Sequence, residues 1–404
     1  MKETLAEFER WAADVIFGRA RGFRAALTRL AMRGLSGIYR AVVQLRLRLY
    51  RRGMIRQRHL GTQVISIGNL TVGGTGKTPV VELFARELRA RGRRVAVLSR
   101  GYKSRRLPKP QQWTSRRTAA PLPAELMPKL VSTGEGPLLD SKHAGDEPFM
   151  LAANLPDVAV IVDKDRVKGG LFAVRELGCD TLILDDGMQY LDLGHALDVV
   201  LVDTKAPFGT EALLPRGTLR EPPRNLRRAS YLFLTKCDGS PNDELIRRLR
   251  RYNQVAEVIE CAHRPRYLQD LFTGERRELP FLAGKWVAAI SGIAVPEGFE
   301  RKLEELGAHV EIRRRFSDHH RYSRREIDRF MDRCVERDMQ LIVTTEKDAV
   351  RFPRPSEIHV PVYFLRIEVE ILRGHAVWQR LIDRLCSSAA TGDPLLRLRD
   401  AVGT

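Results

Sequence analysis

Cysteine and long apolar runs are scarce in this sequence, and each shortage excludes a class of protein. The 404 residues include five cysteines with no C-x-x-C pair, which favours a reducing compartment over a disulfide-bonded secreted fold. No run of about 18 uncharged apolar residues occurs, so we expect no membrane-spanning helix. The first residues, MKETLAEFER, are polar and charged, and we expect no cleavable signal peptide.

Acidic residues are also too few to balance the basic ones. The chain has 69 Lys and Arg against 50 Asp and Glu, a net charge of +19. Such a surplus indicates an anionic partner, which could be nucleic acid, an acidic membrane surface or a phosphorylated ligand. Hydrophobic residues make up 43% of the chain, so a packed core is expected, and the length is enough for two domains.

Residues 1–60 combine many arginines with very few acids after Glu9. Apolar residues recur there at spacings of three or four, which predicts an amphipathic helix. Three interpretations stay open from these residues alone. The helix could lie in a membrane interface with its arginines among anionic headgroups, it could pack on the core with a solvated basic face, or it could bind nucleic acid.

Downstream, short apolar segments alternate with helical patterns, which predicts a parallel α/β sheet. The expected strands of a first unit cover residues 63–68, 94–98, 158–162, 181–184 and 197–202. A second α/β unit is expected to begin near 231–235, with strands at 287–290, 309–312 and 341–344 and helices at 296–306 and 323–338. Residues 103–140, rich in Pro, Arg, Lys and Ser, predict a long surface loop with room for a hairpin.

The stretch TVGGTGKT lies between an expected strand and an expected helix. It follows the phosphate-loop pattern G-x-x-x-x-G-K-[ST], except that Thr71 replaces the first glycine. In such a loop, backbone N–H groups surround a phosphate, the lysine reaches the β- and γ-phosphates, and the threonine hydroxyl binds Mg²⁺. The candidate ATP-binding residues are therefore Thr71, Val72, Gly73, Gly74, Thr75, Gly76, Lys77 and Thr78.

A second candidate site follows the apolar segment LIL, where Asp185 and Asp186 precede a glycine. An apolar strand that ends in aspartate is a typical source of the carboxylate that holds Mg²⁺ beside a nucleotide. A simple turn is the alternative, and the glycine-rich loop upstream favours the metal site. The two motifs together indicate a nucleotide hydrolase or a kinase.

A kinase also needs a group that positions and deprotonates the acceptor hydroxyl. Asp146 and Glu147 in GDEP, and Asp318 and His319 in FSDHH, offer carboxylates and imidazole outside the nucleotide motifs. Spacing alone does not join Asp146 to His319. A helix N-cap at Asp146 and a solvated turn at FSDHH stay open as alternatives.

The ordered motifs GNLTVGGTGKTP, LSRGY, AGDEP, DDGMQ, LLPRGTLREP, SGIA, FSDHH and TTEKDAV resemble the tetraacyldisaccharide 4′-kinase family of the lipid A pathway of Gram-negative bacteria. The resemblance covers most of the chain. It implies transfer of the γ-phosphate of ATP to the 4′-hydroxyl of a tetraacylated glucosamine disaccharide 1-phosphate, which gives lipid IVA. It also implies that a threonine at position 71 is ordinary for this phosphate loop.

The resemblance further implies roles for the matched positions. Asp146 is implied as the catalytic base, assisted by His319, with Lys77 and Arg220 also catalytic. Thr78, Asp185 and Asp186 are implied as the surroundings of Mg²⁺. Substrate-binding roles are implied for Tyr102, Glu147, Arg166, Gln189 and Glu221. The chain departs from the family pattern at Met188, where Phe or Leu is usual, and at Tyr190, where many members have His.

The fold class implied is α/β, a P-loop NTPase-type parallel sheet domain with a second, smaller α/β domain and an N-terminal amphipathic membrane-associated helix. The expected division is a basic helical region at 1–60, the P-loop kinase domain at 61–227, the second domain at 228–370 and a helical tail at 371–404. Closure of the cleft between the two domains would assemble the site and exclude water.

The implied ligands are ATP, Mg²⁺ and the lipid substrate, and the N-terminal helix would bind the membrane surface. We therefore expect a monomer at the cytoplasmic face of the bacterial inner membrane, peripheral or monotopic, with no nucleic-acid partner. Two alternatives remain, a P-loop NTPase that drives a partner protein and a non-catalytic nucleic-acid binder. The amphipathic N-terminus argues against the first, and the ordered nucleotide motifs argue against the second.

Overall fold

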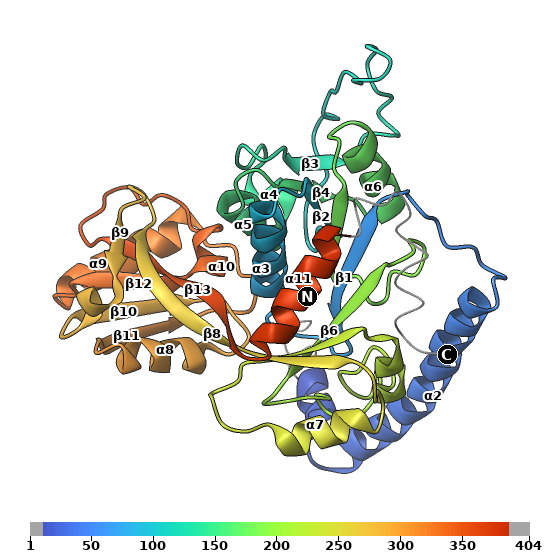
Figure 1. Cartoon of the computed structure of the whole chain (residues 1–404). Coiled ribbons are helices and arrows are strands. Elements are labelled where there is room, and N and C mark those ends of the chain that lie inside the picture. The colour runs from blue at the N-terminus through green and yellow to red at the C-terminus, as the bar shows by residue number, and fades with distance from the viewer. Residues whose placement is uncertain (1–10, 388–404) are drawn as a thin grey trace.

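A single mixed sheet runs through the computed structural model, which describes residues 11–387 (Figure 1). The strand order is β11-β10-β12-β13-β8-β7-β6-β1-β5-β2-β4-β3, and β9 pairs with β8. The strands are β1 Gln63–Asn69, β2 Val95–Ser99, β3 Lys129–Ser132, β4 Ala159–Val162, β5 Thr181–Asp185, β6 Leu197–Asp203, β7 Tyr231–Thr235, β8 Glu257–Asp270, β9 Arg276–Glu278, β10 Trp286–Ser291, β11 His309–Arg315, β12 Leu341–Thr345 and β13 Val362–Arg373. The helices are α2 Phe23–Arg51, α3 Lys77–Ala90, α4 Ser141–Ala144, α5 Asp146–Asn154, α6 Arg166–Arg175, η1 Pro223–Arg228, α7 Asp243–Arg250, η2 Leu279–Leu282, α8 Pro296–Glu305, α9 Arg324–Glu336, α10 Glu346–Ala349 and α11 His375–Ser387.

The N-terminal half of the sheet is parallel around β1, and helices cover both of its faces. Apolar side chains of α3, α5 and α11 pack on one face, and those of α6 pack on the other. Every residue of β1 is buried, as expected for a parallel strand covered on both sides. Because β1, β2, β5, β6 and β7 are parallel, their carboxyl ends meet at one edge of the sheet.

Two long strands, β8 and β13, pair antiparallel and carry the sheet from the N-terminal half to the C-terminal half. Beyond them, β10, β11 and β12 are parallel, with α8 packed on one face and α9 on the other. Pro265 lies inside β8 at a register shift opposite Ile367. Proline has no N–H to give to the ladder, so a bulge is where a central strand can hold it.

The predicted α/β class with a largely parallel sheet is confirmed. Each strand predicted for the two units is present, as are the helices expected at 296–306 and 323–338. The long strands β8 and β13 were not predicted. Tyr231–Thr235, expected to open the second unit, pairs with β6 on one side and β8 on the other. The sheet is continuous across residue 228, and the division there stays a prediction.

The N-terminal helix predicted within residues 1–60 is present as α2, a helix of 29 residues at the periphery of the molecule (Figure 1). It buries Ala25, Gln44 and Leu47, while most of its other side chains are exposed or half-buried. None of the helices within residues 11–387 has the length and apolar character needed to cross a bilayer. Residues 1–10 of the predicted region lie outside the described residues, and residues 11–22 and 52–60 flank α2.

Residues 103–140 form the long connection that the sequence predicts, and it includes the short edge strand β3, which pairs antiparallel with β4. An isolated antiparallel bridge joins Thr114 to Pro121, so the loop folds back on itself. At the other end of the chain, the predicted helical tail begins within β13 and continues as α11. Its residues 388–404 lie outside the described residues.

Candidate active site

The glycine-rich loop joins the end of β1 to the start of α3, which begins at Lys77. Gly76 precedes the helix with φ +78°, and a Cβ there would lie 2.3 Å from the His263 ring. Only glycine fits both the left-handed conformation and that close approach. The first turn of α3 has no side-chain cap, so its N–H groups are available to a phosphate.

Thr71, which replaces the first glycine of the usual pattern, is buried at the base of this loop. The Asn69 amide donates to the Thr71 carbonyl at 2.9 Å and to its hydroxyl at 3.1 Å. The Val72 N–H donates to the Thr218 carbonyl at 2.8 Å. Thr71 therefore fixes the start of the loop by contacts that a glycine could make only in part.

Residues at the ends of β6 and β7 hold the glycine-rich loop by hydrogen bonds. The Lys236 ammonium donates to the Gly74 carbonyl at 2.8 Å and to Asp203 at 2.5 Å. The Thr235 hydroxyl donates to the Thr75 carbonyl at 2.9 Å. These residues end β6 and β7, at the same sheet edge as the loop, and the sequence motifs did not identify them.

Lys77 and Arg220 both form ion pairs with Asp186. The Arg220 guanidinium donates to the two Asp186 oxygens at 2.7 and 2.8 Å, and Lys77 Nζ lies 3.6 Å from Asp186 Oδ1. Lys77 and Arg220 also donate to the Asn69 side chain. Burial opposes ionisation of Asp186, but the Arg220 hydrogen bonds and the Lys77 charge lower its pKa to about 2. Asp186 is therefore a carboxylate whose oxygens are already held by cations.

Asp185, at the end of β5, differs from Asp186 because no cation of the described residues holds its oxygens and its pKa is raised. One of its oxygens accepts from the Ser99 hydroxyl at 3.1 Å, and the other has no hydrogen-bond partner among residues 11–387. Burial, with the charges of Glu147 and Asp186, raises the pKa of Asp185 to about 7. A buried carboxylate oxygen without a donor suits a cation ligand.

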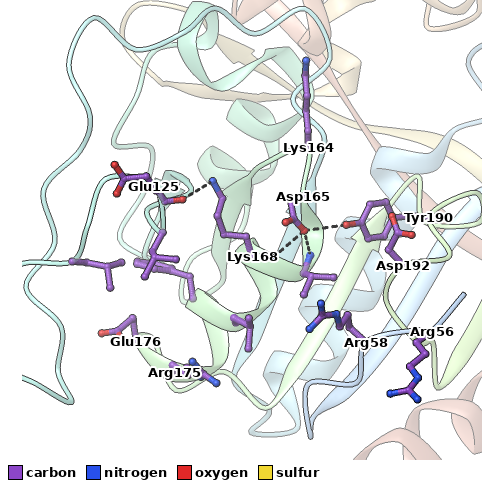
Figure 2. Close-up of a pocket in the computed structure, with 15 residues that line it drawn as sticks. Arg56, Arg58, Glu125, Lys164, Asp165, Lys168, Arg175, Glu176, Tyr190 and Asp192 are labelled. Carbon is purple, nitrogen blue, oxygen red and sulfur yellow. Dashed lines mark hydrogen bonds between the residues drawn. The ribbon is translucent and has the colours of Figure 1, made fainter.

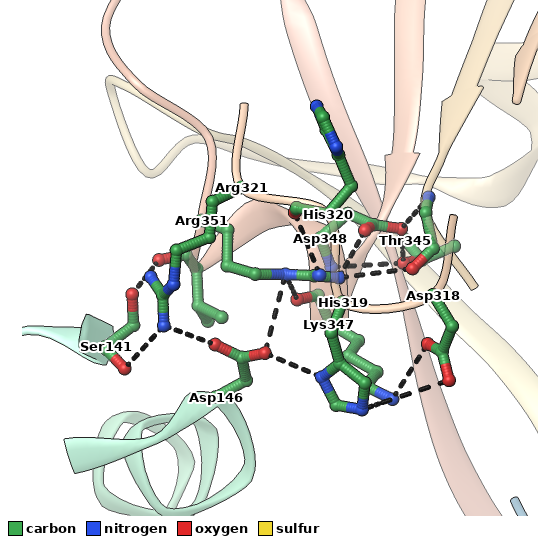
Figure 3. A network of polar contacts seen from close by, with 12 residues as sticks. Ser141, Asp146, Asp318, His319, His320, Arg321, Thr345, Lys347, Asp348 and Arg351 are labelled. Carbon is green, nitrogen blue, oxygen red and sulfur yellow. Dashed lines mark hydrogen bonds and ion pairs between the residues drawn. The ribbon is translucent and has the colours of Figure 1, made fainter. Parts of the chain in front are cut away.

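Asp146 and His319 are brought together from the two halves of the chain (Figure 3). His319 Nδ1 lies 3.0 Å from Asp146 Oδ2, and both side chains are largely buried. Asp146 is the first residue of α5, and His319 sits in a turn with φ +64°. On the other side of the imidazole, Nε2 lies 3.2 Å from Lys347 Nζ. The contact between Asp146 and His319, which their spacing in the sequence could not establish, is therefore present.

Two arginines flank Asp146 on its remaining sides, as Figure 3 shows. The Arg321 guanidinium donates to Asp146 Oδ1 at 3.3 Å, and Arg351 Nε lies 3.6 Å from Oδ2. Burial acts to raise the pKa of Asp146, but the His319 hydrogen bond and the Arg351 and Arg321 charges outweigh it and lower the pKa. Asp146 is therefore an ionised carboxylate at neutral pH.

A buried aspartate, Asp348, holds the loop that carries His319. It accepts hydrogen bonds from the Gly292 N–H at 3.0 Å and the Tyr322 hydroxyl at 3.1 Å, and it pairs with Arg351. The His319 N–H in turn donates to the Gly292 carbonyl at 3.2 Å. The motifs SGIA, FSDHH and TTEKDAV thus converge on one buried polar network.

The predicted substrate-binding residues lie around these two centres. The Tyr102 ring is 5.7 Å from the His319 ring, and Glu147 lies close enough to Asp185 to raise its pKa. Gln189 donates to the Asn69 carbonyl and to Glu221, both at 3.1 Å.

Two of these residues, Glu221 and Arg166, already contact other side chains of the protein. Glu221 is buried and also accepts from Asn225 at 2.7 Å and Arg228 at 2.8 Å. The Arg166 guanidinium stacks 4.6 Å from the Tyr190 ring, so Tyr190 has a partner where many family members have His.

Two cavities open beside this site. The larger, of about 940 Å³, follows α6 between residues 56–58 and 122–126. Figure 2 shows Lys168 reaching across it to the Glu125 carbonyl and Tyr190 bonded to Asp165. The smaller, of about 640 Å³, adjoins Tyr102, and its lining includes the basic residues Arg100, Lys103, Arg106, Lys129 and Lys164.

Several residues of the site had no assigned role from the sequence. Asn69 and Lys347 lie within quoted motifs, GNL and EKD, so the motifs marked their positions without indicating what they contact. Arg351 follows the motif TTEKDAV directly, and Arg321 follows FSDHH directly. Only the folded chain shows that both reach Asp146.

Comparisons with known proteins identify the family to which the chain is similar. A family model described as tetraacyldisaccharide-1-P 4′-kinase, LpxK, matches residues 28–386. A tetraacyldisaccharide 4′-kinase of Anaeromyxobacter dehalogenans (strain 2CP-C) is 41% identical over 340 residues, which cover 83% of this chain and 85% of the relative. One of Syntrophus aciditrophicus (strain SB) is 37% identical over 355 residues, covering 85% and 89%.

A solved structure is also similar. The "apo" form of LpxK from Aquifex aeolicus in complex with ATP matches with a TM-score of 0.67 and 28% identity, and the match covers 89% of this chain and 99% of that one. The range matched by the family model includes both the glycine-rich loop and the Asp146–His319 pair.

Proposed function

This chain belongs to the tetraacyldisaccharide 4′-kinase family, and we propose that it performs the family's phosphoryl transfer with Asp146 and His319 at the acceptor hydroxyl. The enzyme is the ATP-dependent kinase of lipid A biosynthesis that forms lipid IVA. The observation that carries the residue roles is the hydrogen bond of 3.0 Å between Asp146 and His319.

ATP occupies the loop Thr71–Thr78 in this proposal. The β-phosphate lies against the N–H groups at the start of α3, where the helix dipole adds positive potential. Lys77 and Arg220, now on Asp186, are positioned to neutralise phosphate charge as it develops during transfer. Arg220 is held by both oxygens of one carboxylate, which fixes its orientation before ATP arrives.

Mg²⁺ would neutralise phosphate charge during the transfer. We assign Asp185 and Thr78 to it, because Asp185 ends β5 and one of its oxygens has no hydrogen-bond donor among residues 11–387. Mg²⁺ is commonly held by one or two carboxylates together with phosphate oxygens and water, so a small protein ligand set is sufficient. Direct binding by Asp186, as the motif predicts, would require Arg220 to release one of its oxygens.

At the acceptor end, the 4′-hydroxyl gives its proton to Asp146 as its oxygen bonds to the γ-phosphorus, while the bond from that phosphorus to the β–γ bridging oxygen breaks and ADP leaves. His319 donates from Nδ1 to Asp146 and so orients the carboxylate, and Lys347 donates to the other imidazole nitrogen. Closure around the substrate would exclude water, which competes with the sugar for the phosphoryl group.

The lipid substrate has two kinds of surface to meet, anionic and apolar. The cavity beside Tyr102 is rich in lysine and arginine, which suits a phosphorylated disaccharide next to the Asp146–His319 pair. The cavity along α6 includes Leu122, Leu126 and Leu171, which suits part of an acyl chain. Tyr102, Glu147 and Arg166 would contact the sugar, while Gln189 and Glu221 orient Asn69 and the segment that carries Arg220.

The exposed side of α2 supports contact with a membrane. Leu27, Leu30, Ile38, Val42 and Leu45 recur on one side of the helix, and each is more than half exposed. We propose that this apolar stripe lies in the bilayer interface and keeps the enzyme, as a monomer, at the cytoplasmic face of the inner membrane. A helix that packed its apolar side on the protein core would have buried these side chains.

The test of the function is transfer of radiolabelled γ-phosphate from ATP to tetraacyldisaccharide 1-phosphate in detergent micelles, with and without Mg²⁺. We expect label in the lipid only when Mg²⁺ is present. Label released solely as free phosphate, from protein that is folded and binds ATP, would instead assign the chain as an NTPase and leave Asp146 and His319 without this role.

A further inference from the structure

A cluster of arginines lies where α2 meets η1, outside the site described above. Arg40, Arg48 and Arg51 come from α2, and Arg224 and Arg227 come from η1. All five are exposed. Arg40, Arg48 and Arg224 line a shallow cavity of about 490 Å³ whose other walls include Val42 and Leu45.

No acid in the described part of the chain forms an ion pair with this arginine cluster. Among the ion pairs within residues 11–387, none joins any of its five members to an acid. Partial burial and the charges of Arg227 and Arg48 lower the pKa of Arg51, so the members are close enough to repel one another. Two segments far apart in sequence are thus folded together although their charges oppose the contact.

The arginine cluster lies on the flank of α2 that faces away from the ATP site. Tyr39, Arg46 and Tyr50 lie on the other flank, where they contact the Arg220 carbonyl, the Gln189 carbonyl and Asp192. On the arginine side, Gln44 donates to Asn225 at 3.2 Å and fixes η1 against the helix. The cluster therefore lies on a different flank of α2 from the residues that contact Arg220, Gln189 and Asp192.

The arginine cluster is continuous with the apolar stripe of α2. Val42 and Leu45 belong to both the stripe and the wall of the cavity, at 59% and 55% exposed. If the stripe lies among acyl chains, the arginines stand at the depth of the lipid phosphates. Guanidinium groups bind phosphate through two parallel N–H donors, and several of them around one cavity suit a phosphate monoester or diester.

We propose that Arg40, Arg48, Arg51, Arg224 and Arg227 form a binding site for the phosphate of an anionic phospholipid headgroup in the membrane that α2 contacts. The inference rests on the proposed membrane contact of α2 and adds a lipid preference to it. The site holds a bulk lipid and not the substrate, because it opens on the flank away from the catalytic groups. It would orient the enzyme so that the active-site flank of α2 also faces the lipid surface.

The experiment compares binding of the full chain to vesicles of phosphatidylcholine alone and of phosphatidylcholine mixed with phosphatidylglycerol. The test variant is Arg224→Gln/Arg227→Gln, which leaves α2 unchanged. Each arginine near an anionic surface strengthens binding about fivefold, so we expect the variant to bind mixed vesicles about 25-fold more weakly. Its binding to neutral vesicles, its thermal stability and its kinase turnover in detergent should match the parent.

The matched control is Arg325→Gln/Arg329→Gln, which removes two exposed arginines from α9 in the other half of the molecule. It should bind both vesicles as the parent does. Equal binding of the parent to neutral and mixed vesicles, or equal loss in the test and control variants, would overturn the headgroup site while leaving the membrane contact intact. Failure of the parent to bind either vesicle would overturn both, independently of phosphate transfer in micelles. Loss of binding to a duplex oligonucleotide in the test variant, with vesicle binding unchanged, would assign the arginine cluster to nucleic acid instead.

Discussion

Asp146 and His319 lie 173 residues apart in the chain, and a hydrogen bond of 3.0 Å joins their side chains across the two halves of the sheet. Asp146 begins a helix of the nucleotide-binding half, whereas His319 belongs to a loop held by Asp348 in the other half. The proposed base is therefore complete only when both halves are in place. A shared site of this kind ties phosphate transfer to the relative position of the halves.

Loss of either member of the pair should lower turnover and spare ATP binding. We expect Asp146→Asn and His319→Gln each to reduce kcat about 10²- to 10⁴-fold, because a positioned base contributes on that order. The double variant should be little worse than the singles if the two act as a unit. Steady-state kinetics and ATP titration measure this, with His320→Gln, the neighbouring histidine, as the control. Near-parental turnover in both single variants would remove the pair from the mechanism.

Arg321 should set the pH at which Asp146 becomes active. Its charge helps to lower the pKa of Asp146, so removing it in Arg321→Gln raises that pKa. A base with a raised pKa is protonated at higher pH, and the acid limb of the kcat/KM profile should move upward. Arg325→Gln, an exposed arginine on α9, is the control. An unmoved acid limb in Arg321→Gln would mean that another group governs it.

Asp185 should make the metal-free protein less stable as the pH rises. Its folded-state pKa of about 7 exceeds the ordinary aspartate value, so the folded state holds a proton that the unfolded chain loses above about pH 4. The cost grows between about pH 4 and 7, to no more than about 4 kcal/mol.

Asp185→Asn should therefore be more stable than the parent at pH 8 and similar to it near pH 4, as measured by urea denaturation in chelator. Mg²⁺ and ATP should reduce this advantage at pH 8, because a bound cation favours the ionised carboxylate of the parent. Asp332→Asn, at an exposed position on α9, should show neither effect. An advantage for Asp185→Asn that is the same at both pH values would show that the Asp185 pKa is not raised.

Arg366 on β13 should hold the two halves together through buried charges. Its side chain is 2% exposed and pairs with Glu82 of α3 and Glu346 of α10. We expect Arg366→Met to lower the free energy of unfolding by about 3–5 kcal/mol, because it leaves uncompensated buried carboxylates. Arg264→Met, at an exposed position on β8, is the control for urea denaturation. Adding Glu82→Gln to Arg366→Met should restore part of the loss, and a further loss would contradict the pairing.

The parts of the site that the sequence predicts are those in which one short segment contains the whole signal. The loop Thr71–Thr78 and the pair Asp185–Asp186 each follow a buried strand, and local pattern was sufficient to place them. The residues alone made His319 a candidate, and only the family resemblance paired it with Asp146. Arg321 reaches Asp146 across 175 residues, a contact that no local pattern encodes. Strand β8 was missed because Pro265 interrupts its pattern, and its bulge exists only against its partner β13.

Membrane association should depend on the exposed stripe of α2. Leu30→Ser/Ile38→Ser/Leu45→Ser changes three side chains that are each more than half exposed, so thermal stability should change little. Each buried aliphatic side chain stabilises by about 1.5–3 kcal/mol, so each loss should weaken partition into neutral vesicles about tenfold or more. The control is Val255→Ser/Val335→Ser, two exposed valines away from α2. Unchanged partition of the triple variant would mean that a surface other than α2 meets the bilayer, and the arginines beside the stripe would then lose their place at the lipid phosphates.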